Sequence, residues 1–262
     1  MLITGATGGI GTALALSYAS SERTLILHGR DEARLAALCQ TCKDRGARVL
    51  SVTFDLRDSR ATAEKLRQLS QNECPDLLIV NAGITRMIGR EEDGEPLDGA
   101  LEVLAVNLEG ALATVAGVLP EMRLRGCGQI ALISSLAAYY GLPRTPAYSA
   151  SKAALKVYGE ALRAWLAPEG VAVNVVLPGF VDTPMTDSLK GPKPSTMSAQ
   201  RAALLIRRGL ESNRARIAFP RALAWGMQWL SVLPAGLSER IMRALGFGGR
   251  RRRRTVGGQT GA

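Results

Sequence analysis

The chain opens with a short apolar strand, Met1 to Thr4, that leads directly into a glycine-rich turn and then into an apolar helix extending to about Ala19. The turn reads Thr4-Gly5-Ala6-Thr7-Gly8-Gly9-Ile10-Gly11. Glycines let a backbone approach a pyrophosphate closely, and a helix N-terminus offers free N–H groups and the positive end of its dipole. A tight turn without a ligand is the alternative, but a position at the end of the first strand favours a dinucleotide-phosphate site.

Strands and helices alternate along most of the chain. Further strands are predicted at Thr24–His28, Arg48–Phe54, Asp76–Val80, Gln129–Ile133, Val171–Leu177 and, as a short seventh, Arg216–Phe219. The helices expected between them run from Asp31, as N-cap, to Arg45, then Ser59–Ser70, Leu97–Met122, Pro146–Trp165 and Ser198–Leu210. This alternation predicts an α/β fold: a Rossmann-type doubly wound parallel sheet of about seven strands with helices on both faces.

One domain with a C-terminal extension is expected, because no repeat or linker interrupts the pattern. Residues 1–215 are expected to form the dinucleotide-binding domain, which ends in a region at 184–215, and 216–247 a strand and an apolar helical segment. Residues 248–262 are predicted to be a disordered basic tail. Within the domain, 85–98 reads as an exposed loop and 184–197, with three prolines, as a mobile one.

The net charge of +10 belongs to the C-terminal segment alone. Residues 1–200 hold 20 Lys and Arg against 21 Asp and Glu, whereas 201–254 hold 13 arginines and two glutamates, including the run Arg250 to Arg254. Any anionic partner must therefore meet this segment. The run lacks interleaved aromatic residues and a recognition motif, so nucleic-acid binding is not expected.

The segment 217–247 also carries two of the three tryptophans, Trp225 and Trp229. A helix after Pro220 would place Leu223, Met227 and Leu230 on one face. This face either packs on the domain or a second subunit, or it binds a membrane interface with arginines toward anionic headgroups across 217–254. Both interpretations stay open at this point.

The four cysteines predict neither a disulfide framework nor a metal site. Cys39 and Cys42 form a lone C-x-x-C near the end of a helix, and the only histidine is His28. Zinc would need further ligands, so free, reduced thiols and no metal are expected. The sequence shows no signal peptide and no apolar run of the ~18 residues that span a membrane. We expect a cytoplasmic protein, or one bound peripherally at the inner face of a membrane.

A tyrosine and a lysine four residues apart, Tyr148 and Lys152, share one face of the helix that begins at Pro146. Such a pair is common by chance. Its neighbours in the sequence give it weight: Asn107 lies within a long helix, where asparagine is unfavourable, and Ser135 ends the fifth strand.

Taken together, the ordered motifs resemble the short-chain dehydrogenase/reductase family over residues 1 to about 185. They are Thr4-Gly5-x-x-x-Gly9-Ile10-Gly11, Asp55-Leu56, Asn81-Ala82-Gly83, Asn107, Ile133-Ser134-Ser135, Tyr148-x-x-x-Lys152 and Pro178-Gly179-x-x-x-Thr183. Each motif alone is weak, and their joint occurrence in this order is specific.

The resemblance implies a catalytic set of four residues. Tyr148 would be the general acid for carbonyl reduction, or the base in the reverse direction, and Lys152 would lower its pKa and hold the nicotinamide ribose. Ser135 would hydrogen-bond the substrate oxygen, while strand alternation points Ser134 elsewhere. Asn107 would hold a water in a proton relay to Lys152.

The resemblance also implies a cofactor site. Asp55 would contact the adenine amino group, Asn81 and Gly83 would line the cofactor, and Thr183 would meet the carboxamide. The full implied set is Gly5, Thr7, Gly9, Ile10, Gly11, Arg30, Asp55, Leu56, Asn81, Ala82, Gly83, Tyr148, Lys152, Pro178, Gly179, Val181 and Thr183.

NADP(H) is predicted over NAD(H) because Arg30, and no acid, follows the second strand. An arginine there suits a 2′-phosphate, whereas an acid would hold the 2′-hydroxyl. His28 lies close by, and we interpret it as a histidine that merely ends a strand. The chain departs from many NADP-preferring relatives at Gly8, where those carry a basic residue.

The predicted function is an NADP-dependent oxidoreductase (EC 1.1.1.-) acting on a carbonyl or secondary alcohol, with a bulky or lipid-like substrate suggested by the apolar C-terminus. The resemblance places the substrate pocket in residues 84–96, 136–147 and 184–215 and implies a homodimer or homotetramer. The alternatives are a non-catalytic nucleotide-binding scaffold, which the intact Tyr148 and Lys152 disfavour, and a peripheral membrane protein on the same fold.

Overall fold

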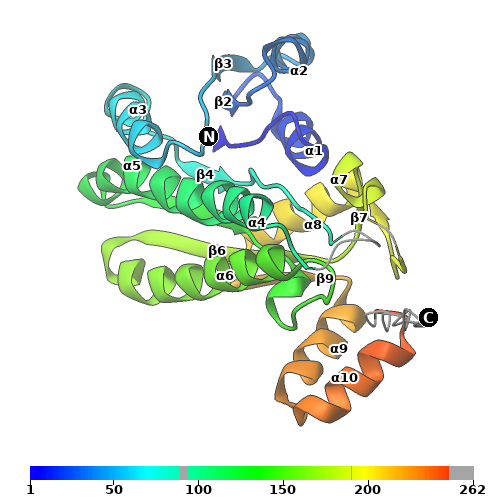
Figure 1. Cartoon of the computed structure of the whole chain (residues 1–262). Helices are drawn as coiled ribbons and strands as arrows, with labels where there is room; N and C mark the ends of the chain where they lie inside the picture. The colour runs from blue at the N-terminus through cyan, green and yellow to red at the C-terminus, as the bar shows by residue number, and fades with distance from the viewer. Residues whose placement is uncertain (89–93, 190, 248–262) are drawn as a thin grey trace, which may run out of the picture.

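The computed structural model describes residues 1–88, 94–189 and 191–247, and its centre is a seven-stranded sheet (Figure 1). The strand order is β3-β2-β1-β4-β5-β6-β9, and every neighbouring pair is parallel. The chain reverses its direction of travel across the sheet between β1 and β4. Ligands of open α/β sheets bind at such a switch point, outside the carboxyl ends of the strands.

All seven predicted strands are confirmed. The sheet contains β1 (Leu2–Ile3), β2 (Thr24–His28), β3 (Arg48–Val52), β4 (Leu77–Val80), β5 (Gly128–Ile133), β6 (Val171–Pro178) and β9 (Arg216–Phe219). The α-helices are α1 (Gly9–Tyr18), α2 (Glu32–Asp44), α3 (Ser59–Asn72), α4 (Leu97–Leu104), α5 (Gly110–Arg125), α6 (Pro146–Leu166), α7 (Pro184–Asp187), α8 (Ala199–Glu211), α9 (Arg221–Val232) and α10 (Ala235–Ala244).

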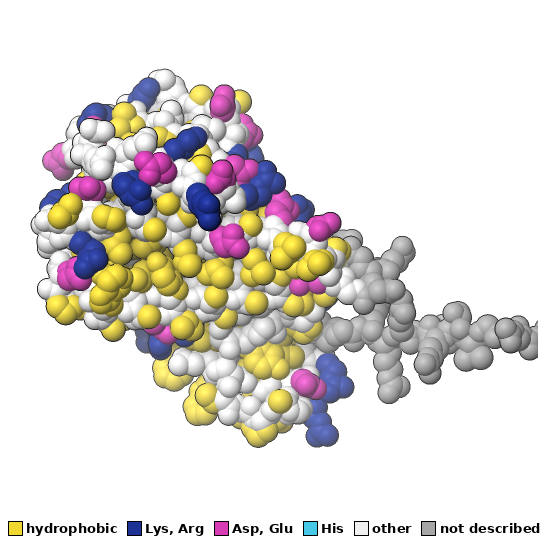
Figure 2. Space-filling model, turned by 60° about the vertical axis from the view of Figure 1, so that its left-hand side comes forward, with side chains coloured by type: hydrophobic (Ala, Val, Ile, Leu, Met, Phe, Trp, Pro, Cys, Tyr) yellow, Lys and Arg dark blue, Asp and Glu magenta, His cyan; other side chains and the backbone are white. Residues whose placement is uncertain are grey.

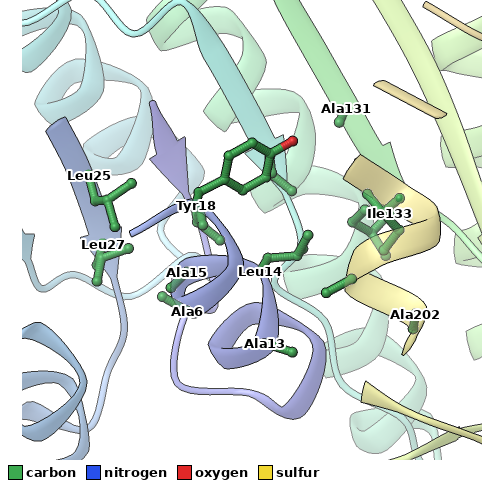
Figure 3. Close-up of a cluster of buried hydrophobic side chains, with 14 of the residues drawn as sticks. Ala6, Ala13, Leu14, Ala15, Tyr18, Leu25, Leu27, Ala131, Ile133 and Ala202 are labelled. Atoms are coloured by element: carbon green, nitrogen blue, oxygen red, sulfur yellow. The ribbon is translucent and has the colours of Figure 1, made fainter. Parts of the chain in front are cut away.

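Alternation along the strands builds one apolar core on each face of the sheet. Ile3, Leu25 and Leu27 pack with Leu14 of α1 on one face (Figure 3). The intervening Ile26 joins the opposite core. Helices α1, α2 and α8 supply the first core, and α3, α5 and α6 the second.

Local side-chain caps fix where several helices begin. Asp31 accepts a hydrogen bond from the backbone N–H of Arg34 at 3.0 Å, which confirms it as the N-cap of α2. Asp58 caps α3 in the same way through Ala61 N at 2.9 Å. Each cap satisfies an N–H that the helix leaves free at its start.

The helix predicted over Leu97–Met122 is continuous but not uniform. A π-helical turn, Ala105–Glu109, separates α4 from α5 and carries Asn107. The combined segment Leu97–Arg125 is long and apolar enough to cross a membrane by composition, which the sequence analysis did not anticipate. However, 61% of its most apolar window is buried inside the protein, as in the core helix of a globular domain.

Both ends of the region 184–197, predicted as a mobile loop, carry regular structure. It begins with α7, and at its end β8 (Met197–Ser198) pairs in parallel with β7 (Val181–Asp182). Thr183 caps α7 by accepting from Thr186 N at 3.3 Å. Three prolines concealed this short structure, because they weaken both helical and strand patterns.

Helices α9 and α10 form a hairpin below the sheet (Figure 1). Ala224, Met227 and Leu230 of α9 are buried against a third core that includes Leu177 of β6 and Leu136. The C-terminal segment thus packs on the domain through one face. Trp225 and Trp229 of the same helix stay 61% and 60% exposed. The predicted disordered tail, 248–262, lies outside the described residues.

Candidate active site

Two cavities meet at the carboxyl ends of the central strands. The smaller, of about 380 Å³, extends from the glycine-rich turn across the ends of β1, β4 and β5. The larger, of about 1140 Å³, lies between β5, β6 and the α9–α10 hairpin. Ser135 and Tyr148 line both cavities, so a hydroxyl and a phenol stand at their junction.

The glycine-rich turn fits closely against its surroundings. Gly5 has φ +62°, and a Cβ there would lie 2.7 Å from Cα of Ala82. A Cβ on Gly9 would lie 2.3 Å from Cγ2 of Thr183. Asn81 holds the turn by donating from Nδ2 to the carbonyl oxygens of Thr4 at 3.1 Å and Gly5 at 3.0 Å. Only glycine permits this conformation at Gly5 without strain.

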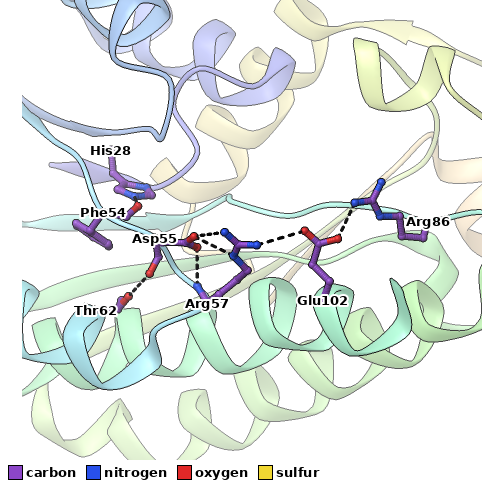
Figure 4. Close-up of polar contacts among 7 residues, drawn as sticks. All are labelled: His28, Phe54, Asp55, Arg57, Thr62, Arg86 and Glu102. Carbon is purple, nitrogen blue, oxygen red and sulfur yellow. Dashed lines mark hydrogen bonds and ion pairs between the residues drawn. The ribbon is translucent and has the colours of Figure 1, made fainter. Parts of the chain in front are cut away.

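His28 is buried beside Phe54 and supports the turn (Figure 4). The backbone N–H of Gly5 donates to Nδ1 at 3.4 Å, and Nε2 lies 3.0 Å from the carbonyl oxygen of Phe54. Because a backbone N–H can only donate, Nδ1 is the acceptor and Nε2 carries the proton. Burial lowers the pKa of His28, which keeps the ring neutral. The interpretation as a strand-ending histidine is confirmed, with this added task.

Tyr148 and Lys152 lie on one face of α6, as their spacing predicts. Nζ of Lys152 is 5.8 Å from the centroid of the Tyr148 ring and donates to the carbonyl oxygen of Ile133 at 2.8 Å. Lys152 is buried, and this burial lowers its pKa to about 8. It therefore carries its charge at neutral pH.

Burial and a neighbouring hydroxyl act in opposite directions on the pKa of Tyr148, and the lowering expected from Lys152 stays a prediction. Burial raises the pKa of Tyr148, and only the hydrogen bond with the Ser135 side chain acts to lower it. The physical reason is that desolvation disfavours the phenolate. Tyr148 is accordingly a neutral phenol at pH 7, in the form that can donate a proton.

Asn107 is fully buried, and its side chain fastens three elements together. Oδ1 accepts from Ile84 N at 2.7 Å, and Nδ2 donates to the carbonyl oxygen of Ile84 at 2.9 Å and to Oγ of Ser151 at 3.1 Å. These bonds join the segment after β4 to α6. They explain a mid-helix asparagine without a water, so the predicted relay role stays a prediction.

Ser134 and Ser135 diverge, as strand alternation predicts. Oγ of Ser134 donates to the carbonyl oxygen of Lys152 at 2.7 Å, which ties α6 to β5. Oγ of Ser135 accepts from Ala137 N at 3.1 Å and lies at the junction.

At the nucleotide end, Arg30 and Asp55 line the smaller cavity, and so does Arg34. A chain of charges runs from Asp55 through Arg57 and Glu102 to Arg86 (Figure 4). Nε of Arg57 donates to Asp55 Oδ2 at 2.8 Å and holds the pKa of Asp55 below its usual range. The Asp55 carboxylate is thus already engaged by an arginine, and its contact with adenine stays a prediction.

Sixteen of the seventeen predicted cofactor residues line the smaller cavity. Gly11 does not; a Cβ there would lie 2.3 Å from the Gly5 carbonyl oxygen, so it serves close packing of α1 on the turn. Further residues line the smaller cavity that were not predicted to do so: Gly8, His28, Asp31, Arg34, Ile84, Val106, Ile133, Ser134, Pro184, Met185 and Thr186. Arg34 carried a usable signal, because it lies in the first turn of the helix that begins directly after Arg30 and Asp31.

The larger cavity differs from the predicted substrate region. Residues from 85–88, 135–145 and 185–194 line it as expected, but none from 195–215 does. The hairpin supplies the rest of the wall: Leu223, Gly226, Met227, Trp229, Leu230, Leu233, Ile241, Met242, Leu245, Gly246 and Phe247. The described lining contains Arg144 and Lys193 and no carboxylate. The hairpin residues were not predicted to line a cavity, because the sequence of 216–247 indicates only an extension of the domain.

Comparison with known proteins decides the family, because the short chain dehydrogenase family model matches residues 1–193. The chain belongs to this family. An uncharacterized oxidoreductase of Myxococcus xanthus is 34% identical over 93% of this chain and 96% of its own length.

Two solved structures extend this likeness to three dimensions. A short-chain dehydrogenase from Sphingobium yanoikuyae in complex with NADPH has a TM-score of 0.78 and 26% identity, covering 92% of this chain and 94% of that one. A short chain dehydrogenase from Burkholderia cenocepacia in complex with NADP has a TM-score of 0.75 and 27% identity, over 92% and 96%.

Family membership makes the chain an NAD(P)-binding oxidoreductase, and the smaller cavity fits that cofactor. Gly5 and Gly9 form a cradle that any Cβ would fill, at the N-terminus of α1. In the part of the chain that the structure describes, no cluster of residues could hold a metal ion. All four cysteines are free.

Proposed function

We propose that this protein reduces a bulky, largely apolar ketone with NADPH, or oxidises the corresponding secondary alcohol with NADP. The observation that carries the proposal is the junction: Ser135 and Tyr148 line the nucleotide cavity and also a separate, larger cavity. A substrate oxygen in the larger cavity can therefore meet both hydroxyls beside the nucleotide.

The roles follow from the chemistry of these groups. When bound, NADP(H) supplies or accepts the hydride. Ser135 donates a hydrogen bond to the substrate oxygen, and Tyr148, neutral at pH 7, gives that oxygen its proton. Lys152, charged and buried beside the tyrosine ring, stabilises the phenolate that remains and holds the nicotinamide ribose.

The preference for NADP(H) rests on two arginines. Arg30 and Arg34 both line the nucleotide cavity. Of the two acids in the same lining, Asp31 is occupied as the cap of α2 and Asp55 is paired with Arg57. Two guanidinium groups form ion pairs with a 2′-phosphate, which a neutral 2′-hydroxyl cannot form. Two solved relatives hold NADPH or NADP, which supports the same choice.

The proposed substrate class rests on the walls of the larger cavity. They are formed largely by aliphatic and aromatic side chains of the hairpin, and the volume of about 1140 Å³ exceeds what a short ketone needs. Burying apolar surface there would supply most of the binding energy.

Turnover tests this function directly. NADPH oxidation is followed at 340 nm against ketones from butanone to long-chain and polycyclic ketones, with the Tyr148→Phe variant as control. We expect activity to rise with apolar bulk and to fall about 10²-fold or more in the variant. A protein that binds no NADPH, or that keeps its turnover in Tyr148→Phe, refutes the proposal. Binding of NADPH without turnover of any ketone favours a scaffold.

A second candidate is peripheral membrane contact at an inner membrane face. Trp225, Trp229 and Val232 are exposed on the hairpin, which also carries the exposed Arg221, Arg240 and Arg243. Exposed tryptophans beside arginines suit an anionic interface. The full-length protein should sediment with vesicles of phosphatidylglycerol but not phosphatidylcholine, and a Trp225→Ala/Trp229→Ala variant should not; equal sedimentation of both contradicts this candidate.

The proposed homo-oligomer uses a different surface. Figure 2 brings the side with α3, α5 and α6 forward and shows a band of hydrophobic side chains across it. The large exposed apolar residues of α4 to α6 are Leu97, Leu101, Leu124, Val157 and Trp165. A second copy of the chain would cover them, which gives the homodimer or homotetramer a definite interface to test.

A further inference from the structure

The helix that carries Tyr148 and Lys152 begins without a cap of its own. Thr145 stands at the N-cap position of α6, but its side chain makes no capping hydrogen bond. Its Oγ1 is buried with no hydrogen-bond partner in the described structure. Pro146 has no N–H, so the first free donor of the helix is Ala147 N.

Glu95 fills this place from outside the helix. Both carboxylate oxygens accept from Ala147 N, Oε1 at 3.2 Å and Oε2 at 3.0 Å, across 52 positions of sequence. The capping residues of α2, α3 and α8, in contrast, lie only three residues before the N–H from which they accept a hydrogen bond. A negative charge also interacts favourably with the positive end of a helix dipole.

The start of α6 is fastened at a second point, to Ile88. Ile88 N donates to the carbonyl oxygen of Arg144 at 2.9 Å, and the Arg144 guanidinium donates back to the carbonyl oxygen of Ile88 at 2.8 Å. Ile88 lines the larger cavity together with Thr85 and Met87. One wall of that cavity is therefore tied to the start of α6.

We propose that Glu95 is a positioning residue that sets the location of the Tyr148 phenol. Tyr148 directly follows the capped Ala147, so a shift of the first helical turn moves the phenol relative to Ser135. Because displacements of about 1 Å reduce turnover strongly, a cap at this point acts on the chemical step. The inference rests on the proposed function of Tyr148.

The experiment compares Glu95→Ala and Glu95→Gln with Asp58→Ala. Asp58 makes an equivalent cap on α3 through Ala61 N, and neither residue lines either cavity. We expect both alanine variants to melt about 2–4 °C lower. Only Glu95→Ala should lose kcat, by about tenfold, with KM for NADPH unchanged. Glu95→Gln, which keeps an acceptor oxygen, should recover most of that loss.

A readout independent of turnover separates this inference from the proposed function. Amide hydrogen exchange of the first turn of α6 should quicken in Glu95→Ala and stay unchanged in Asp58→Ala. A kcat within twofold of wild type in Glu95→Ala, or an equal kcat loss in Asp58→Ala, overturns the positioning role. If Tyr148→Phe keeps full turnover, the proposed function fails instead, whatever the exchange shows.

Discussion

His28 shows how one side chain supports a binding turn without touching the reaction. Its Nδ1 accepts from Gly5, and its proton sits on Nε2 toward Phe54. A protonated ring would have to give up the bond to Gly5, because both nitrogens would then be donors. The neutral form is therefore part of the folded turn.

A pH dependence of stability follows from the lowered pKa of His28. The contribution is fully present above the unfolded pKa of ~6.5 and is lost as the pH falls below it, because the unfolded state then binds more protons. Urea unfolding at pH 5 to 8 should show the stability advantage of wild type over His28→Asn shrinking toward pH 5. A stability advantage that stays constant with pH would contradict this prediction. Carboxylates that titrate in the same range are present in both proteins, so their effect cancels in the difference between the two free energies of unfolding.

Arg30 permits a test of nucleotide choice at a single side chain. Arg30→Ala should raise KM for NADPH by about tenfold or more and leave KM for NADH nearly unchanged, since only NADPH carries the 2′-phosphate. Steady-state kinetics with both nucleotides measure this, with Arg34→Ala beside it. Equal changes for the two nucleotides would show that Arg30 does not contact the phosphate.

Most residues that line the smaller cavity were predictable because strand ends fix their positions. Parallel strands bring their carboxyl ends to one edge, so residues that follow β1, β4, β5 and β6 converge whatever lies between. The direction of the Tyr148 pKa was not predictable from spacing. It depends on burial by segments distant in sequence, and Glu95 as a cap was hidden for the same reason.

Among the elements, strands formed by long apolar runs were predicted correctly, whereas short irregular elements within helices were not. Val171 to Leu177 is apolar almost throughout and became β6, buried on both faces. The π-helical turn at Ala105–Glu109 leaves no periodic signature, because it inserts within an otherwise continuous helix. The hairpin was recognised as helical, but its place in the cavity wall arises only from packing.

Two glycines in helices predict opposite effects of one substitution. A Cβ on Gly117 of α5 would lie 2.7 Å from Cβ of Leu66 in α3, whereas a Cβ on Gly226 of α9 meets nothing within 4 Å. Gly117→Ala should lower the free energy of unfolding by about 1–3 kcal/mol through overpacking. Gly226→Ala should raise it by about 0.5–1 kcal/mol, because alanine favours a helix. Denaturant unfolding measures the free energy of unfolding of both variants. A decrease in both would contradict the prediction for Gly226.

At the scale of the whole molecule, two exposed apolar surfaces have separate proposed partners. The band on α4 to α6 is assigned to a second copy of the chain, and the outer face of the hairpin to a membrane. Val157 is 62% exposed on the first surface and Val232 is 70% exposed on the second, so one substitution can distinguish them.

Val157→Arg should shift the protein to monomer, because it places a charge in the self-association surface, while Val232→Arg should leave the oligomer intact. Light scattering after size exclusion measures the mass of each variant at matched concentration. An unchanged mass in Val157→Arg, or dissociation by Val232→Arg instead, would move the interface elsewhere.

The two cavities share few residues, and this separation has a consequence for divergence. Within the described chain, only Ser135, Tyr148, Gly179, Met185 and Thr186 line both. The hairpin contributes to one cavity and not to the other, so its sequence can change without disturbing nucleotide recognition. Exchanging α9 and α10 with those of a relative should therefore change which size of ketone is turned over, while the use of NADPH persists. The hairpin is thus a part of the cavity wall that can be replaced independently of the nucleotide site.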